Sequence, residues 1–429
     1  MIADAFTKMY PNVTIEFVRT KPIGTEEECA QWFTTQIAAN KCPAIAFTWG
    51  TAYQSRDWYL PMDEYLDMPN PFIEGNEHWR DAYPEYLWTN HAVANGKGEV
   101  VSIPVALYPG PATGYYYNKE MFEAVGITEL PRTLEELIDI KKKLEAAGYT
   151  GIAPYEGFTK VTTDQWITQF VVGPAVGSYL MDQVDYNKNG AVEVNEQIRG
   201  VKAGLYNPVT NAYAREVWGQ MKRYFNEVLE TGWETTDYWK KWSSGEVGMV
   251  EDGLWRMTNE NNNTYREFEY GIFPCVLMST DTTEYAKEIE MTEKGPYQPD
   301  PDLGLNVMKD AVKDDEDLRN AAILFLQFLT TPENVTSLVQ ENKVTIGAVK
   351  GAEAPSQLAE WLNQPFPKVP VARWPIAFTT EQNTNANAVF ETWVKGGMSD
   401  DAFYDKMNEI QQTGADDYIK SLNIDTSGW

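Results

Sequence analysis

The segment DYNKNGAVEVNE, residues 185–196, has oxygen-bearing side chains at its first, third, fifth and twelfth positions and a glycine at its sixth. This is the order of the calcium loop of an EF-hand, in which carboxylate, amide and carbonyl oxygens surround a hard cation and a glycine makes a sharp turn. The expected calcium ligands are the side chains of Asp185, Asn187, Asn189 and Glu196 and the carbonyl of Ala191.

A plain β-hairpin explains the same segment. Asn189 and Gly190 form a preferred hairpin turn, and the alternation of Val192 and Val194 after them suits a strand. In a hairpin these two valines would lie on one face, and Glu196 would point to water. Neutral amides at the third and fifth loop positions speak against calcium, whereas the full match of the pattern exceeds what a turn needs. The sequence leaves both interpretations open, and they differ most at Glu196.

Composition limits the classes of protein and of site. At 429 residues the chain is long enough for two domains, and 43% hydrophobic residues provide material for their cores. A formal charge of −28 repels phosphate backbones, so we expect no nucleic-acid partner. Three cysteines without a C-x-x-C pair and only two histidines argue against a disulfide framework, a zinc site and a histidine-dependent catalyst.

Aromatic residues are abundant, at 13% of the chain with 15 tryptophans and 24 tyrosines. Flat amphipathic rings suit sugar faces as well as protein cores. No stretch approaches the ~18 apolar residues of a membrane-spanning helix, so we expect a soluble body. The first residues lack the basic start and apolar run of a secretory signal, and we expect the chain to begin inside a folded unit.

Strand and helix patterns alternate along the chain. Strands are expected at residues 13–18, 44–49, 99–108, 245–255, 269–276 and 303–308. Helices are expected at residues 26–40, 134–148, 213–233, 315–335 with an interruption at Pro332, and from about residue 400 to the end. Thr133 and Glu136 form a capping box at the start of the second helix. This alternation predicts an α/β fold with mostly parallel sheets.

Catalytic motifs are missing from the sequence. It contains no G-x-G-x-x-G, phosphate-binding loop, G-x-S-x-G or H-E-x-x-H pattern. Among 63 acidic residues a pair with glycosidase spacing can always be imagined, so the pairing carries no information. We therefore favour a binding protein over an enzyme.

The order of several segments resembles the extracellular solute-binding proteins of ATP-driven sugar importers, a maltose-binding-protein-like family. The first group of segments is AIAFTWG, SIPVALY, YYYNKEMFEAVGI and LPRTLEELIDIKKKLEAAG. The later group is FNEVLETGW, WSSGEVGMVEDGLW, YGIFPC, AAILFLQFLTTPENV and TIGAVKGAE. Each segment alone is weakly specific, but their order covers nearly the whole chain. The family usually has a strand before its first helix, whereas Met1 here lies inside that helix.

The resemblance implies two α/β lobes with a hinge and a cleft between them. We expect residues 1–112 and 276–331 in the first lobe and residues 113–275 and 332–429 in the second. The chain would cross near residues 110–115, 273–275 and 330–333. The calcium loop would lie away from the cleft, so a bound ion would be structural. The implied partners are an oligosaccharide and the permease subunits of an ABC importer. We expect a monomer outside the cell, either a surface lipoprotein or a periplasmic protein, with no cofactor required.

The same resemblance suggests ligand-binding residues. Trp255 lies in the turn where the family often places an aromatic that stacks on sugar. Trp49 ends a strand at the edge where α/β proteins bind ligands, and Gln54, Arg56 and Asp57 follow it in the loop. Further candidates are Tyr108, before the first crossing, and Trp166, Trp374 and Phe378.

Two alternatives to sugar capture for an importer remain. One is a glycan-active enzyme, a glycosidase or lyase with a tryptophan-lined cleft. The other is the same fold binding a peptide or another solute. An enzyme would release reducing sugar from glycans, whereas a binding protein would only change its melting temperature.

Overall fold

The structure is a computed structural model that divides into two compact units, which are described separately. It describes residues 2–18, 26–47, 57–89, 93–95, 97–110, 113–153, 173–188, 192, 194–229, 232, 238–297, 299–368, 374–375, 378–422 and 424–429. Unit 1 comprises Met1–Gly110 and Gln298–Ala359, and unit 2 comprises Pro111–Tyr297 and Glu360–Trp429.

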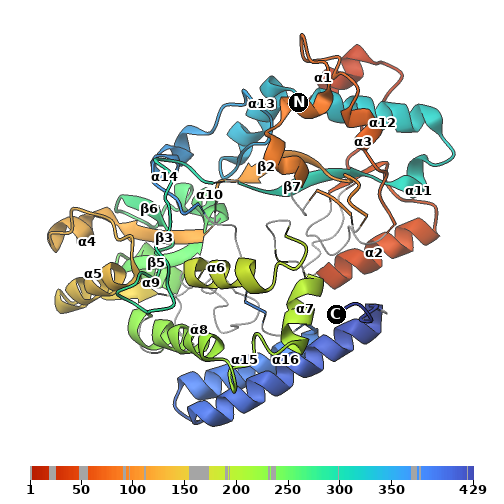
Figure 1. Cartoon of the computed structure of the whole chain (residues 1–429). Helices are drawn as coiled ribbons and strands as arrows, with labels where there is room; N and C mark the ends of the chain where they lie inside the picture. The colour runs from red at the N-terminus through yellow and green to blue at the C-terminus, as the bar shows by residue number, and fades with distance from the viewer. Residues whose placement is uncertain are drawn as a thin grey trace. The chain divides into compact units, whose positions relative to one another are not determined.

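Unit 1 is built on a four-stranded sheet with the order β1-β7-β2-β8. Strands β2 and β7 of this sheet are labelled in Figure 1. Its strands are β1 (Ile45–Phe47), β2 (Ile103–Tyr108), β7 (Asp300–Val307) and β8 (Ile346–Gly347). Its helices are α1 (Ile2–Met9), α2 (Glu26–Ala38), α3 (Asp63–Leu66), α11 (Lys309–Val312), α12 (Glu316–Leu329) and α13 (Pro332–Asn342), with shorter 3-10 turns η2 (Trp79–Ala82), η3 (Glu85–Thr89) and η8 (Ser356–Leu358).

Two helices of unit 1 show how local sequence determines its core. Phe6 of α1 is fully buried, and its ring lies 5.2 Å from Phe325 and 5.5 Å from Phe328. The helical pattern of residues 315–335 is divided into α12 and α13 because proline suits the first turn of a helix and not its interior. Thr331 caps α13 by accepting a hydrogen bond from the Asn334 amide. The expected interruption at Pro332 is confirmed.

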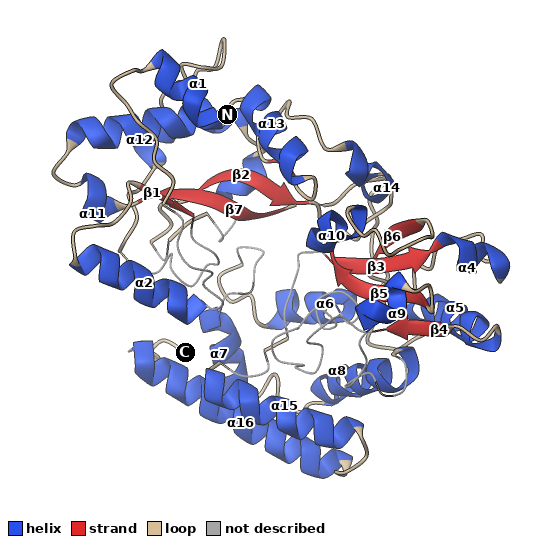
Figure 2. Cartoon of the chain, turned by 180° about the vertical axis from the view of Figure 1, so that it is seen from behind, coloured by secondary structure: helices blue, strands red, loops and turns tan. Residues whose placement is uncertain are grey.

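Unit 2 is built on a second four-stranded sheet, with the order β4-β5-β3-β6 (Figure 2). Its strands are β3 (Thr113–Asn118), β4 (Thr150–Ala153), β5 (Val247–Gly253) and β6 (Tyr270–Pro274). Its helices are α4 (Lys119–Ala124), α5 (Leu134–Ala146), α6 (Gly173–Gln183), α7 (Val194–Lys202), α8 (Ala212–Arg223), α9 (Tyr238–Ser243), α10 (Met257–Asn261), α15 (Thr380–Val394) and α16 (Asp400–Leu422), with the π-helical turn η5 (Tyr224–Val228) and the 3-10 turn η7 (Leu254–Arg256). Helix α14 (Ala359–Leu362) begins at the last residue of unit 1.

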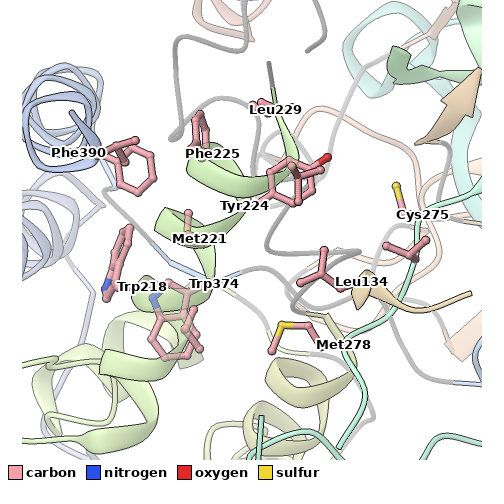
Figure 3. Packing of buried hydrophobic residues seen from close by; sticks show 14 of the residues in the cluster. Leu134, Trp218, Met221, Tyr224, Phe225, Leu229, Cys275, Met278, Trp374 and Phe390 are labelled. Carbon is pink, nitrogen blue, oxygen red and sulfur yellow. The ribbon is translucent and has the colours of Figure 1, made fainter. Parts of the chain in front are cut away.

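The core of unit 2 joins α8, the sheet and the C-terminal helices. Figure 3 shows Trp218, Met221 and Tyr224 from α8 and η5 among buried side chains that also include Phe390 of α15. Helices α15 and α16 lie side by side (Figures 1 and 2). The capping box predicted for α5 is present, since Thr133 accepts from the Glu136 amide and Glu136 accepts from the Thr133 amide.

The prediction of mostly parallel sheets is wrong. Among the strands that the structure describes, only β4 and β5 pair in parallel, and β1–β7, β2–β7, β2–β8, β3–β5 and β3–β6 are antiparallel. The prediction assumed that strands consecutive in sequence are neighbours joined by a crossover helix. Instead β7, from the middle of the chain, lies between β1 and β2.

The observed units also differ from the expected lobes. Residues 276–297 belong to unit 2, because Val276, Met278 and Ala286 are buried in its core. Residues 332–359 belong to unit 1, because β8 pairs with β2 and Val335 is buried in the core of that unit. In addition, residues 13–18 form no strand, although their alternating pattern predicts one.

Candidate functional site

The end of β5 presents one aromatic side chain to solvent. All seven residues of β5 are buried, and Leu254 and Met257 are 0% and 4% exposed. Trp255 lies between them in η7 and is 37% exposed. An exposed indole beside buried neighbours is suited to stacking on the apolar face of a sugar.

Charged and aromatic side chains support the turn that carries Trp255. The Arg256 guanidinium lies 3.6 Å from the centroid of the Trp239 ring, a cation–π contact, and its Nε is 3.4 Å from Glu260 Oε1. Glu260 is 1% exposed and accepts a hydrogen bond of 2.9 Å from Trp242 Nε1. Arg266 adds a second ion pair to Glu260 at 3.5 Å. These contacts compensate the desolvation of the carboxylate and hold α10 against α9.

The opposite face of the same sheet contains a buried chain of hydroxyl groups. The hydroxyls of Tyr115 and Tyr224 are 2.8 Å apart, and Tyr224 donates to Glu251 Oε2 at 2.5 Å. Burial raises the pKa of both tyrosines well above the usual value, and the nearby Glu251 carboxylate raises each pKa further. Both phenols are therefore neutral at physiological pH. The two phenols and the Glu251 carboxylate therefore form a buried hydrogen-bonded group that joins η5 to β3 and β5.

The three cysteines are distributed over both units: Cys29 and Cys42 are half-buried in unit 1, and Cys275 is buried in unit 2. Burial raises the pKa of Cys42 to about 11, and it raises the pKa of Cys275 well above the usual value. Thiols with a raised pKa are poor nucleophiles and poor metal ligands, because the thiolate is the reactive form.

The predicted ligand residues of unit 1 are in part described. Tyr108 is the last residue of β2, is half-buried, and is in register with Asp300 of β7. Asp57 is exposed, and its Oδ2 lies 2.7 Å from Lys309 Nζ. The hydrogen bond from Lys309 lowers the pKa of Asp57. Trp49, Gln54 and Arg56 lie outside the described residues.

Two other predicted ligand residues of unit 2, Trp374 and Phe378, pack against neighbouring rings. Trp374 is 0% exposed and lies in the core, where its ring centroid is 4.8 Å from that of Tyr206 (Figure 3). A fully enclosed ring has no face for a sugar. Phe378 is half-buried and lies 6.3 Å from Tyr418 of α16, measured between ring centroids. Trp166 lies outside the described residues.

The segment 185–196 lies between two helices. Helix α6 ends at Gln183, bends follow through residue 187, and α7 begins at Val194. Glu196 is only 7% exposed, and its Oε1 accepts a 3.1 Å hydrogen bond from the Asn187 amide. The hairpin interpretation is therefore wrong, since it placed Val194 in a strand and Glu196 in water. The turn propensity of residues 189–190 suggested the hairpin, but the backbone from Val194 onward is helical.

Two of the five expected calcium ligands are carboxylates, and both are buried. Asp185 is 4% exposed and Glu196 is 7% exposed. Asn187 belongs to the same turn, whereas Asn189 and Ala191 lie outside the described residues. Within the described part of the chain, no group of three or more histidine, cysteine or acidic residues is arranged to hold a metal ion. Two acidic residues combined with amide and carbonyl oxygens still match the donor chemistry of calcium.

Sequence reasoning missed Glu251, Arg256 and Glu260. A signal existed for the last two, because an arginine followed four residues later by a glutamate forms an ion pair on a helix. Glu251 lies in an apolar strand, where an acidic residue indicates a buried polar partner. That partner, Tyr224, comes from a different element and cannot be identified by local spacing.

The chain folds into two units, each built on a four-stranded sheet with helices packed around it. Residues 1–336 match the model of a family described as bacterial extracellular solute-binding protein, and the chain belongs to this family. The family supplies substrate-binding components of ABC transporters and is not enzymatic, which confirms the prediction of a binding protein. Among curated proteins no match was found.

Solved structures of other solute-binding proteins share the fold. A family 1 extracellular solute-binding protein from Bifidobacterium longum subsp. infantis is 17% identical, with a TM-score of 0.63 over 96% of this chain and 95% of the other. The apo-form of RafE from Streptococcus pneumoniae is 15% identical, with a TM-score of 0.63 over 96% and 93%. The maltose-bound MalE3 of T. maritima is 14% identical, with a TM-score of 0.59 over 96% and 94%.

No helix among the described residues is both long enough and apolar enough to span a bilayer.

Proposed function

We propose that this chain captures a carbohydrate, in particular an oligosaccharide, outside the cell and delivers it to the permease subunits of an ABC importer. The observation that supports this most directly is Trp255, 37% exposed at the end of a fully buried strand. Raffinose and maltose are the ligands of two proteins with the same fold. The chain would act as a surface lipoprotein or in a periplasm, as a monomer.

The proposed binding residues come from both units. Trp255 would stack on a pyranose ring, burying apolar area at about 25 cal/mol/Å². Tyr108 would contribute from unit 1, and Trp49, Gln54 and Trp166 remain proposed contacts. Asp57 would accept a hydrogen bond from a sugar hydroxyl at a lone pair that its Lys309 partner does not use. Trp374 is not part of the proposed site, because its ring is fully enclosed in the core of unit 2. Phe378 is half-buried and remains a proposed contact.

The proposed mechanism is hinge closure. A sugar that contacts both units binds the closed state more tightly than the open state, and this difference in affinity shifts the population toward closure. The permease would then recognise the closed state of the protein. No covalent step is needed.

Thermal-shift and calorimetric titration against maltose, raffinose, chitin oligosaccharides and a control peptide test this function. We expect a sugar to raise the melting temperature, since a ligand that binds only the folded state stabilises it. Trp255→Ala should weaken that sugar's binding by about 1–3 kcal/mol, as for loss of a buried stacked aromatic. Tyr265→Ala, which removes an aromatic that is 84% exposed, is the matched control and should leave binding unchanged.

The alternatives give different results in the same experiment. A shift with the peptide and with none of the sugars would favour another solute. Release of reducing sugar from the oligosaccharides would favour a glycan-active enzyme and contradict the proposal. If Trp255→Ala binds sugar as tightly as the wild type, Trp255 is not a stacking residue.

We also propose that residues 185–196 bind a structural calcium ion. The helix–turn–helix context and the burial of Asp185 and Glu196 support this assignment. Glu196 occupies the first turn of α7, where the helix dipole favours a carboxylate and where the twelfth residue of a calcium loop belongs. When bound, the ion would tie the turn after α6 to the start of α7.

Chelation tests the calcium proposal independently of sugar binding. A chelator should lower the melting temperature, and added calcium should restore it. Glu196→Gln should abolish this response and leave sugar affinity largely intact. Asp182→Asn, at an exposed acidic residue near the end of α6, is the matched control and should keep the response. A wild-type melting temperature that is the same with chelator and with calcium would rule the ion out.

A further inference from the structure

The Trp255 indole lies against the backbone of Gly253. A Cβ added to Gly253 would be 2.2, 2.2 and 2.3 Å from Cη2, Cζ2 and Cε2 of Trp255. These three atoms are consecutive in the six-membered ring, and a point equally distant from three atoms of a regular hexagon lies on the axis through its centre. The missing Cβ would therefore stand over the face of the ring and not beside its edge.

This geometry makes the indole a one-sided platform. The face toward Gly253 is covered by backbone, so the 37% exposure of Trp255 belongs to the opposite face and the ring edges. Any residue other than glycine at position 253 would place a carbon far inside van der Waals contact with the ring. The φ angle of Gly253 is −83°, which all residues adopt readily, so ring clearance and not backbone strain is the reason for glycine here.

Both polar groups of the Gly253 backbone are held by buried side chains. Its N–H donates to Asp252 Oδ1 at 2.6 Å, and its carbonyl accepts from the Tyr116 hydroxyl at 2.8 Å. Asp252 is 2% exposed and Tyr116 is fully buried. Register with Thr113 of β3 fixes the same residue in the sheet. The backbone on which the indole lies is therefore held by hydrogen bonds on both sides of the Gly253 Cα.

We propose that Gly253 is a positioning residue for ligand binding, which fixes the orientation of Trp255, and that Asp252 and Tyr116 fix Gly253 in turn. This inference rests on the proposed function, in which Trp255 stacks on a sugar. A ring orientated before the ligand arrives loses less conformational freedom on binding, and this preorganisation contributes to affinity. Gly253→Ala would displace the ring while leaving all its atoms in the protein.

A double-mutant cycle tests the proposal with whichever of maltose, raffinose or a chitin oligosaccharide binds the wild type. We expect Gly253→Ala to weaken binding by about 5- to 150-fold, the range for losing the stacked ring itself. In the Trp255→Ala background, Gly253→Ala should have no further effect, because the ring it displaces is absent. Gly248→Ala is the matched control in the same strand, since its Cβ would meet Leu144 at 2.6 Å and not Trp255.

A second measurement needs no ligand. In protein labelled with 5-fluorotryptophan, the fluorine resonance that disappears in Trp255→Phe identifies Trp255. Gly253→Ala should move this resonance more than any other, and Gly248→Ala should leave it in place. Tyr116→Phe removes one hydrogen bond to Gly253 and should produce a smaller shift in the same resonance.

The outcomes separate this inference from the proposed function. If Trp255→Ala leaves sugar binding unchanged, the stacking role fails, and the fluorine spectra still report whether Gly253 positions the ring. If Trp255→Ala weakens binding but Gly253→Ala does not, the positioning role is overturned. Equal loss from Gly253→Ala with and without the indole would show a general disturbance of β5 and would also overturn it.

Discussion

The turn after β5 and the segment before α15 each carry a tryptophan that the sequence marks as a ligand contact, and the structure gives them opposite environments. Trp255 is 37% exposed and Trp374 is fully buried. Trp255 lies two residues after Gly253, whose backbone supports its ring. Trp374, in contrast, is enclosed by tyrosines from distant segments. The difference shows that a tryptophan in a loop becomes a binding surface only if nothing from elsewhere in the chain covers it.

The largest expected effect concerns Trp374, the buried tryptophan of the two. Trp374→Ala should destabilise unit 2 by about 3–5 kcal/mol, because it leaves a cavity between Tyr206 and Tyr213. Chemical denaturation followed by circular dichroism measures the change. Trp255→Ala is the paired control and should cost less than about 1 kcal/mol of stability. Equal destabilisation by both substitutions would erase the distinction between the two environments.

The second prediction concerns the ion pairs that support the turn carrying Trp255. Glu260→Ala should destabilise unit 2 by about 3 kcal/mol, because it leaves Arg256 and Arg266 partly buried without their carboxylate. The low end of the usual range applies, since Arg256 is 23% exposed. Denaturation curves measure the loss, and Glu267→Ala, at an exposed glutamate in the same region, is the control. A change no larger than that of the control would show that the ion pairs of Glu260 do not stabilise unit 2.

The smallest effect is expected at an ion pair in unit 2, the unit whose core contains Trp374. This ion pair joins α5 to α8. Arg223 binds Glu135 with two hydrogen bonds of 2.8 and 2.9 Å, and these lower the pKa of Glu135 below its ordinary 4.5. A lowered pKa in the folded state adds stability above pH 4.5, which is lost as the pH falls through the folded value. Because Glu135 is 36% exposed, solvent screening limits the contribution to about 0.2–1 kcal/mol.

The measurement for this ion pair is stability as a function of pH in wild type and Glu135→Gln. The wild type should be slightly more stable at pH 7, and the difference should disappear in acid. Added salt should reduce it, because exposed pairs are screened. A difference that persists at pH 2 would assign the effect to packing and not to charge.

Local signals in the sequence predicted the elements well. The capping box at Thr133 and Glu136, the break at Pro332 and the turn after β5 depend on residues within a few positions of one another. Physical rules for helix ends and turns act over the same range, so the sequence is sufficient there. The resemblance of ordered segments then identified the family.

Features that depend on distant residues could not be predicted in this way. The burial of Trp374 depends on Tyr206 and Tyr213, which lie more than a hundred residues earlier in the sequence. The direction of strand pairing failed for the same reason, since β7 pairs with β1 and β2 from the start of the chain. In residues 185–196 two backbones matched one pattern, and the helix that begins at Val194 excludes the strand that the hairpin required there.

The hydroxyl chain of Tyr115, Tyr224 and Glu251 has a direction. Tyr224 has a single hydroxyl proton, and it is donated to Glu251, so the contact with Tyr115 must be donated by Tyr115. The three groups thus form a polar sequence that runs one way, from the first phenol toward the carboxylate. Its links are consequently unequal: Tyr115→Phe removes one partner from Tyr224, whereas Tyr224→Phe removes a partner from both neighbours and interrupts the sequence at its centre.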